Sequence, residues 1–251
     1  MHALFRAYDL AAYNAVNLGI AHPILDLGCG NGAFGSVFCR VHGFDGLDFG
    51  MDVSSKNVRL AQQRGDYKVV SQGDVRALPF KTGVIRSILC NGVLCCVHPG
   101  YDLALQEIAR ILQTGGQLAM TIPTPRFTEV LLPTRLCKGL GLYRLATLYA
   151  RMVNHRNGHR TLEYLDVWRK ELACAGLKVE HYINYFSGSE ATWWSLFAMR
   201  PFQSFAILRY LPEFIQHFAV AFTAKLIHPV PRSTHPQETE YGYLLIVARK
   251  L

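Results

Sequence analysis

The sequence of 251 residues lacks an uninterrupted apolar run long enough to cross a membrane. Its most apolar stretch, 193–230, carries only four formal charges. Pro201 and Pro212 nevertheless divide this stretch into pieces shorter than the roughly 20 apolar residues of a transmembrane helix. We therefore expect short apolar helices here and no membrane-spanning segment.

A secretory signal is also missing from the start of the chain. The apolar residues of the first 19 positions are interrupted by Arg6, Asp9 and Asn14, a pattern that predicts an amphipathic helix. We expect a cytoplasmic protein, with peripheral contact at a membrane surface as an alternative.

Cysteine pairs of the kind that hold metals are lacking as well. The seven cysteines show no regular pairing, which is typical of the reducing cytosol and not of a disulfide framework. Cys90, Cys95 and Cys96 lie close together in the chain, but they do not form two C-x-x-C pairs. We predict no metal site.

The most informative segment that is present is 24–32, which reads Ile-Leu-Asp-Leu-Gly-Cys-Gly-Asn-Gly. It joins a short apolar strand to a glycine turn and to a helix expected from Gly32 to Val41. Gly28 and Gly30 allow backbone angles and a close ligand approach that a Cβ would prevent, and the first helical amides point to the same place. The third glycine comes too early for the dinucleotide fingerprint G-x-G-x-x-G, so we disfavour nicotinamide and flavin cofactors.

Acidic residues follow where the next strands should end. Asp52 closes the second expected strand in a Gly-x-Asp-x-Ser pattern, and we expect Ser54 to cap the helix 55–63. Asp48 competes with Asp52, because it lies nearer the usual distance from the glycine turn. Asp74 ends the third expected strand.

Strands and helices alternate through residue 123, which predicts a parallel sheet with helices on both faces. The fourth strand ends in Asn91-Gly92, and a glycine turn leads into the fifth strand at 117–122. Ligands of such sheets bind at the carboxyl ends of the strands. The glycine turn, the acids and Asn91 should therefore face one site.

The run Asp-Leu-Gly-Cys-Gly-Asn-Gly at 26–32 resembles the first motif of class I S-adenosylmethionine (SAM) dependent methyltransferases, and residues 22–123 continue the resemblance motif by motif. The resemblance implies an α/β fold with a Rossmann-like, doubly wound sheet of seven strands. This sheet would be mostly parallel with an antiparallel last strand, and helical lid insertions would be added to it. The resemblance also implies that SAM is the cofactor and that an acceptor atom attacks the sulfonium methyl group in line.

Each motif carries an implied role in cofactor binding. In the family the acid after the second strand takes both ribose hydroxyls, which suits an ionised carboxylate at Asp52 or Asp48. Asp74 matches the acid that meets the adenine amino group, and Asn91-Gly92 matches the floor beneath the methionine half. The expected cofactor-binding residues are Asp26, Gly28, Cys29, Gly30, Asp52, Val53, Asp74, Val75, Asn91 and Gly92.

We expect a single domain over 1–251, since a chain of this length can bury a full core. Its parts are the helical cap 1–21, the cofactor-binding core 22–123, the basic helical lid 124–160, the helix and sixth strand 161–186, the apolar helical insertion 187–240 and the last strand 241–251.

Positive charge is concentrated in 124–160, which holds seven basic residues and one acid, Glu129, and so supplies +6 of the formal +8. Apolar residues recur every three or four positions from Thr134 to Val153, which predicts one basic amphipathic helix. Such a segment suits a lid over the acceptor site, a shallow membrane contact or a grip on RNA phosphates. A helix packed on the sheet with a solvated basic face is the ordinary alternative.

The candidate catalytic base is His98. Cys95-Cys96 stand where many members of the family have Glu-His, and His98 follows them in the same loop. A histidine is largely neutral near pH 7, as a base must be, although an ordinary surface histidine is the alternative. Secondary candidates are His155, His159, Tyr8 and Tyr13.

Two further absences narrow the acceptor. No Asn-Pro-Pro-Tyr follows the fourth strand, which disfavours methylation of adenine or glutamine amino groups, and the carboxylate cluster of divalent-metal catechol enzymes is not apparent. We predict metal-independent O-, N- or C-methylation of a small, hydrophobic acceptor. An RNA methyltransferase and a non-catalytic binding protein of the same fold are the alternatives.

Overall fold

The computed structural model describes residues 2–16, 18–198 and 241–251, and these contain one seven-stranded sheet. Its order is β3-β2-β1-β4-β5-β7-β6, and β7 runs antiparallel to both of its neighbours. The expected Rossmann-like sheet with an antiparallel last strand is confirmed. The strands are β1 (Ile24–Leu27), β2 (Leu47–Asp52), β3 (Tyr67–Gln72), β4 (Ile85–Asn91), β5 (Leu112–Pro123), β6 (Leu177–Ser187) and β7 (Tyr241–Lys250).

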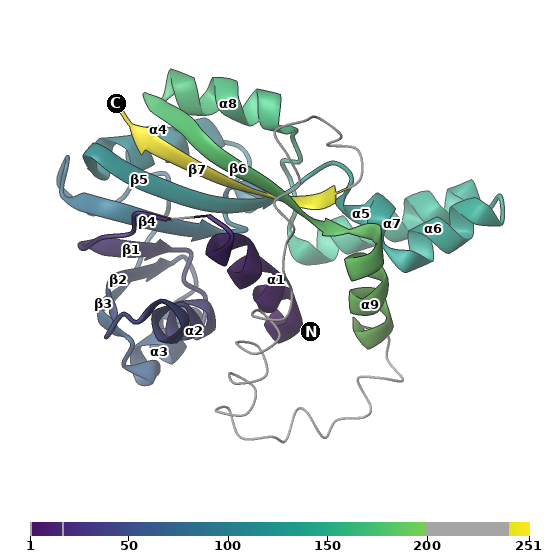
Figure 1. Cartoon of the computed structure of the whole chain (residues 1–251), viewed down its shortest axis with the longest axis horizontal. Helices are drawn as coiled ribbons and strands as arrows, with labels where there is room; N and C mark the ends of the chain where they lie inside the picture. Colours follow the sequence, from purple (N-terminus) through teal and green to yellow (C-terminus); the bar gives the residue numbers. More distant parts are fainter. Residues whose placement is uncertain (1, 17, 199–240) are drawn as a thin grey trace.

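Helices cover both faces of this sheet (Figure 1). They are α1 (His2–Asn14), α2 (Ala33–His42), α3 (Ser55–Arg64), the 3-10 helix η1 (Leu94–Cys96), α4 (Tyr101–Ile111), α5 (Phe127–Val130), α6 (Leu132–Gly139), α7 (Tyr143–Asn157), α8 (Leu165–Cys174) and α9 (Gly188–Ala198). Successive strand residues point to opposite faces, so Ile24 and Leu245 join the core beneath α1 and α2. Their neighbours Leu25 and Leu244 join a second core beneath α4 and α8.

The sequence signals around the first two crossover helices are confirmed. α2 begins one residue after Gly32, and α3 follows Ser54, whose Oγ accepts a hydrogen bond from the Asn57 amide at 3.4 Å. Both helices end at a glycine in the left-handed region, Gly43 and Gly65. Local chemistry therefore sets these boundaries.

Two expected boundaries are wrong. The single helix from Thr134 to Val153 is two helices, α6 and α7, because the chain turns through Gly141 at φ +73°. The fifth strand begins at Leu112 and not at Gln117, since Gly115 with φ +71° lets the strand bend without ending it.

The carboxyl ends of the parallel strands meet at one edge of the sheet, where the site was expected. Figure 1 shows α1, α5, α6, α7 and α9 gathered at this end, where the lid was expected. Of the expected apolar insertion 187–240, residues 199–240 lie outside the described residues. Within the part of the chain that the structure describes, no helix is both long and apolar enough to span a bilayer.

Candidate functional site

The glycine turn lies directly after β1. Gly28 has φ +74°, and a Cβ there would lie 2.2 Å from Val93 Cγ2, so only glycine fits. The amides of Gly28 and Cys29 donate to the Met51 carbonyl at 2.7 and 2.9 Å, which fixes the turn against β2. Among the described residues, and apart from its chain neighbours, nothing lies within 4 Å of a Cβ placed on Gly30, which has φ +55°. The turn is therefore packed on one side and faces open space on the other.

Asp52 lies beside this turn at the carboxyl end of β2. Its Oδ2 accepts a hydrogen bond from the Gly30 amide at 2.9 Å. Its Oδ1 accepts from the Ser54 amide at 2.9 Å and from Asn57 Nδ2 at 3.2 Å. The carboxylate is thus held in one orientation next to the open space, which is where the acid of the second motif was expected.

Asp48, the competing acid, lies near the opposite end of β2. Its carboxylate accepts from Lys68 Nζ at 2.7 Å and from the Ile24 amide at 2.7 Å, and it also pairs with His22. Burial opposes ionisation, but these hydrogen bonds outweigh burial and lower the pKa of Asp48 to about 2. The structure therefore places Asp52, and not Asp48, at the glycine turn.

Asp74 follows β3 and is held by an arginine that the sequence analysis missed. Arg76 donates to Asp74 Oδ2 through Nη2 at 2.6 Å and to Oδ1 through Nε at 3.0 Å. The hydrogen bonds from Arg76 hold the pKa of this carboxyl below its usual range. Arg76 Nη1 also donates to the Pro99 carbonyl at 3.3 Å, so it ties the Asp74 loop to the loop that carries His98. The only sequence signal was an arginine two residues after the acid.

The two valines that follow the acids differ in exposure. The Val53 side chain is 70% exposed beside Asp52, whereas Val75 packs partly against the core beneath α4. The Gly73 amide donates to the Asp52 carbonyl at 3.1 Å, which joins the second and third motifs. Asp74 and Val75 are therefore connected to the glycine turn through Asp52.

Asn91 is the last residue of β4 and Gly92 follows it, at the same edge of the sheet as the glycine turn. Asn91 Oδ1 accepts from the Tyr13 hydroxyl at 2.8 Å and from Thr121 Oγ1 at 3.2 Å. Among the described residues, the buried Nδ2 of Asn91 has no hydrogen-bond partner. Gly92 has φ +62°, and a Cβ there would meet nothing within 4 Å. A buried donor and a second glycine that faces open space fit a polar ligand bound across the strand ends.

Asp26 and Cys29 lie beneath the turn, where they are buried. Asp26 Oδ2 accepts from the Tyr67 hydroxyl at 2.7 Å, and burial, followed by the Asp26 charge, raises the pKa of Tyr67 far above its usual value. Burial likewise raises the pKa of the Cys29 thiol, so this thiol stays protonated at neutral pH. Asp26 and Cys29 are therefore part of the packed support of the glycine turn.

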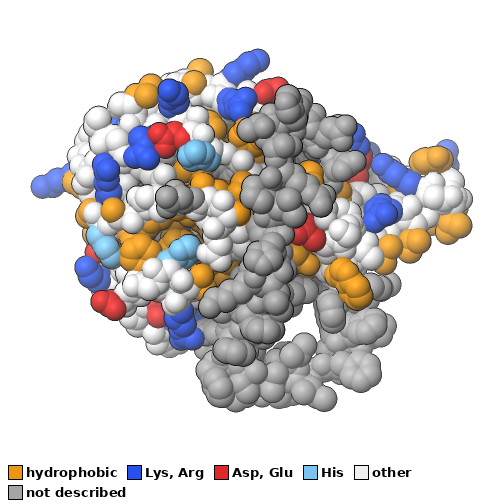
Figure 2. Space-filling model, in the orientation of Figure 1, with side chains coloured by type: hydrophobic (Ala, Val, Ile, Leu, Met, Phe, Trp, Pro, Cys, Tyr) orange, Lys and Arg blue, Asp and Glu red, His pale blue; other side chains and the backbone are white. Residues whose placement is uncertain are grey.

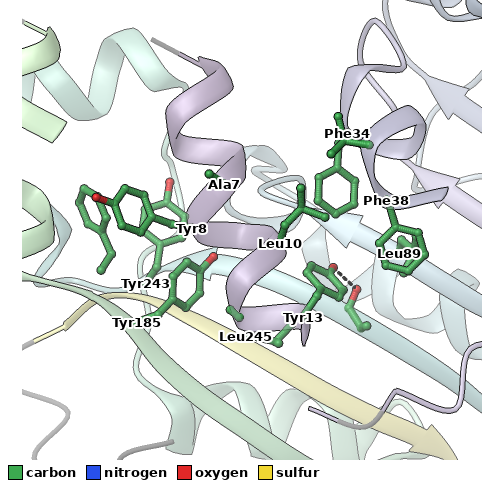
Figure 3. Packing of buried hydrophobic residues seen from close by; sticks show 14 of the residues in the cluster. Ala7, Tyr8, Leu10, Tyr13, Phe34, Phe38, Leu89, Tyr185, Tyr243 and Leu245 are labelled. Atoms are coloured by element: carbon green, nitrogen blue, oxygen red, sulfur yellow. Dashed lines mark hydrogen bonds between the residues drawn. The ribbon is translucent and has the colours of Figure 1, made fainter. Parts of the chain in front are cut away.

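Helix α1 lies at the carboxyl ends of the strands (Figure 1). The sequence predicted this helix, but it did not predict its contacts with other elements. Figure 3 shows Tyr13 directed toward Phe34 and Phe38 of α2, while Tyr8 lies toward Tyr185 and Tyr243. The sequence analysis did not identify the buried pair in which the Tyr185 hydroxyl donates to Asp9 Oδ1 at 2.7 Å. Asp9 and Tyr185 lie 176 positions apart in the chain, so no local sequence pattern could have predicted that they pair. Burial first, and the Asp9 charge second, raise the pKa of Tyr185 well above its usual range.

The expected base, His98, is exposed in the loop between η1 and α4. Cys95, three residues before His98, contacts the end of the basic segment 124–160: its carbonyl accepts from the amides of Arg160 and Thr161 at 2.7 and 3.0 Å. His159 in the same segment is half-buried, and burial lowers its pKa to about 4, so it is neutral at pH 7. The basic segment and the helix η1 that precedes the His98 loop therefore meet at Cys95.

Comparison with known proteins agrees with this architecture. The sheet order and the glycine turn define a Rossmann-like α/β protein with its site at the carboxyl ends of the strands. Residues 25–120 match the model of the family described as Methyltransferase domain. This match supports the expected resemblance to class I SAM-dependent methyltransferases in this part of the chain, and it supports SAM as the cofactor.

One curated relative is the fatty-acid O-methyltransferase of Mycolicibacterium smegmatis, which is 30% identical over 107 residues. That alignment covers 41% of this chain and 38% of the relative, so the chain matches well under half of the relative's length.

Solved structures extend the likeness of fold to nearly the whole chain. The [4+2]-cyclase SpnF has a TM-score of 0.59 at 20% identity, over 98% of this chain and 80% of that one. The geranyl diphosphate C-methyltransferase of Streptomyces coelicolor has a TM-score of 0.61 at 14% identity, over 97% of this chain and 79% of that one. At these identities the likeness concerns the fold alone.

Proposed function

We propose that this protein uses SAM to methylate a small hydrophobic acceptor. The observation that carries the proposal is the Asp52 carboxylate held on the Gly30 amide at 2.9 Å, beside a backbone where, among the described residues, a Cβ on Gly30 or on Gly92 would meet nothing within 4 Å. Among the same residues, the buried Nδ2 of Asn91 has no hydrogen-bond partner. An ionised acid suits hydroxyl donors, and an amide suits a carboxylate. The ribose and the methionine end of SAM offer these groups.

When bound, SAM supplies a methyl group on a positively charged sulfur, which makes that methyl electrophilic. The residues of this chain would bind and orient SAM: Asp52 would accept hydrogen bonds from the ribose hydroxyls, and Asn91 Nδ2 would donate to the methionine carboxylate. Asp74 would accept from the adenine amino group while it remains paired with Arg76. Helix α1 packs against β6 and β7, and α5 packs against β7, so these two helices would help to exclude water from this end of the sheet.

A hydrophobic acceptor is supported by the relatives of this chain. The chain is similar to a fatty-acid O-methyltransferase over 107 residues and shares its fold with a geranyl diphosphate C-methyltransferase. We propose fatty acids as the first acceptor class to test.

The test is transfer of a labelled methyl group from SAM to fatty acids or prenyl alcohols, with product extracted into organic solvent. We expect methyl esters from at least one fatty acid. The fold also occurs in a [4+2]-cyclase, so turnover needs its own measurement. Binding of SAM without transfer to either acceptor class would favour the non-catalytic alternative.

Alanine at His98 separates two kinds of acceptor. A fatty-acid carboxylate is already ionised at pH 7, so with such an acceptor we expect His98→Ala to leave turnover unchanged. With a hydroxyl acceptor, loss of a general base should lower kcat by about 10²-fold or more. The measurement is kcat with both acceptor classes, and unchanged turnover with both would remove His98 as the base.

A further inference from the structure

The α6–α7 hairpin, residues 132–157, presents an apolar surface to solvent. Figure 1 shows it projecting away from the sheet, and Figure 2 shows hydrophobic and basic side chains side by side on the same projection. Seven apolar side chains here are between 46% and 74% exposed, a density far above isolated surface leucines. They are Leu136, Leu140, Leu142, Tyr143, Leu145, Leu148 and Met152.

The exposed side chains of α7 form a stripe separate from its packed face. Leu145, Leu148 and Met152 are spaced three and four residues apart, so they lie on one side of the helix. Ala146 and Val153, which are buried, fix the side that packs on the protein. The apolar stripe therefore faces away from the core and needs a partner outside it.

Arginines flank this stripe. Arg144 lies four residues before Leu148 and Arg151 three residues after it, which places both guanidinium groups along one border of the stripe. Within the described ranges, no acidic side chain pairs with either arginine. The single acid of 124–160, Glu129, is already engaged by Arg126 and Lys138.

We infer that the α6–α7 hairpin docks on an anionic lipid surface, with the leucine stripe among the acyl chains and the arginines at the headgroups. Exposed aliphatic side chains bordered by basic ones are the pattern of helices that lie in a membrane interface. Long basic side chains keep their charge at the headgroups while their stems stay apolar. Phosphates of RNA would match the arginines but would leave the leucines without contact.

The hairpin is connected to the proposed site by the residues that follow α7. The amides of Arg160 and Thr161 donate to the Cys95 carbonyl in η1, which follows β4. A docked hairpin would place the protein on the surface from which a lipophilic acceptor comes. The docking itself does not depend on methyl transfer and is tested without it.

The test is flotation of the purified full chain with vesicles of phosphatidylcholine alone or mixed with phosphatidylglycerol, at low salt. We expect co-flotation with the anionic vesicles, and at least tenfold weaker binding for Arg144→Glu/Arg151→Glu. The matched control is Lys56→Glu/Arg59→Glu on α3, which changes the net charge equally at two exposed positions. This control should retain most of the binding.

Leu148→Glu tests the apolar stripe, with Leu60→Glu on α3 as its control at a 39% exposed leucine. We expect only Leu148→Glu to lose binding at least tenfold, while its thermal midpoint and its affinity for SAM stay unchanged. Failure of the wild type to float, or equal losses in the α3 controls, would overturn the inference. A third outcome would also overturn it: the wild type does not bind vesicles but self-associates, and Leu148→Glu makes it monomeric. The apolar stripe would then be a contact between copies of this chain.

Discussion

Replacing Asp52 by asparagine is expected to weaken SAM binding by about 10²-fold or more. The carboxylate would lose two charge-assisted hydrogen bonds to the ribose, each worth about 1.5–3 kcal/mol, and about 1.4 kcal/mol corresponds to tenfold. It also holds the Gly30 amide at 2.9 Å, so the substitution loosens the glycine turn that lines the same space. Calorimetric titration with SAM and with S-adenosylhomocysteine measures the effect.

Asp48→Asn is the matched control, because it removes the same charge from the same strand. It lies away from the glycine turn, so the affinity for SAM should stay within about twofold of wild type, inside the roughly 0.5 kcal/mol typical of distant sites. The folded pKa of Asp48, about 2, lies below the unfolded value of about 3.9. This carboxylate therefore stabilises the fold above about pH 4, and the contribution is lost as the pH falls through about 2.

The control should thus lose about 2 kcal/mol of stability at pH 7, measured by denaturant unfolding, and the difference from wild type should shrink at low pH. If Asp48→Asn abolished SAM binding while Asp52→Asn did not, the assignment of the ribose acid would be wrong.

Local chemistry explains which parts of the site could be predicted from the sequence. The Gly28–Gly32 turn, the Ser54 cap and the acid at the end of β2 each depend on residues a few positions apart, so a motif identifies them. The choice between Asp48 and Asp52 needed the exact bounds of β2, because the strand runs from Leu47 to Asp52 and only Asp52 lies at its carboxyl end. A difference of four residues reverses the end of the sheet on which the carboxylate lies.

Contacts between distant segments explain what the sequence could not show. Asp9 and Tyr185 are paired only because α1 packs against β6, and Asn91 is recognised as an unpartnered donor only after its neighbours on α1 and β5 are placed. The exposed stripe on α7 has the same helical periodicity as a buried face. Apolar spacing predicts a helix, but it does not tell which of two apolar faces meets the core.

Replacing Gly30 by alanine is expected to lower the affinity for SAM by about 10- to 100-fold. Its Cβ would enter space where, within the described ranges and apart from the chain neighbours, no atom lies within 4 Å, and we assign this space to the cofactor. Forcing one extra methyl group into a packed site typically costs about 1–3 kcal/mol, which corresponds to that loss.

Backbone strain must be separated from the loss of space, since Gly30 has φ +55°. Gly43→Ala supplies the comparison, because Gly43 has φ +73°, has nothing within 4 Å of its Cβ and lies at the other end of α2. Both variants should lose about 1–2 kcal/mol of stability through a left-handed alanine, but only Gly30→Ala should lose affinity. If Gly30→Ala and Gly43→Ala had the same affinity for SAM, backbone strain alone would explain the effect of both substitutions. The space facing Gly30 would then not be the place where SAM binds.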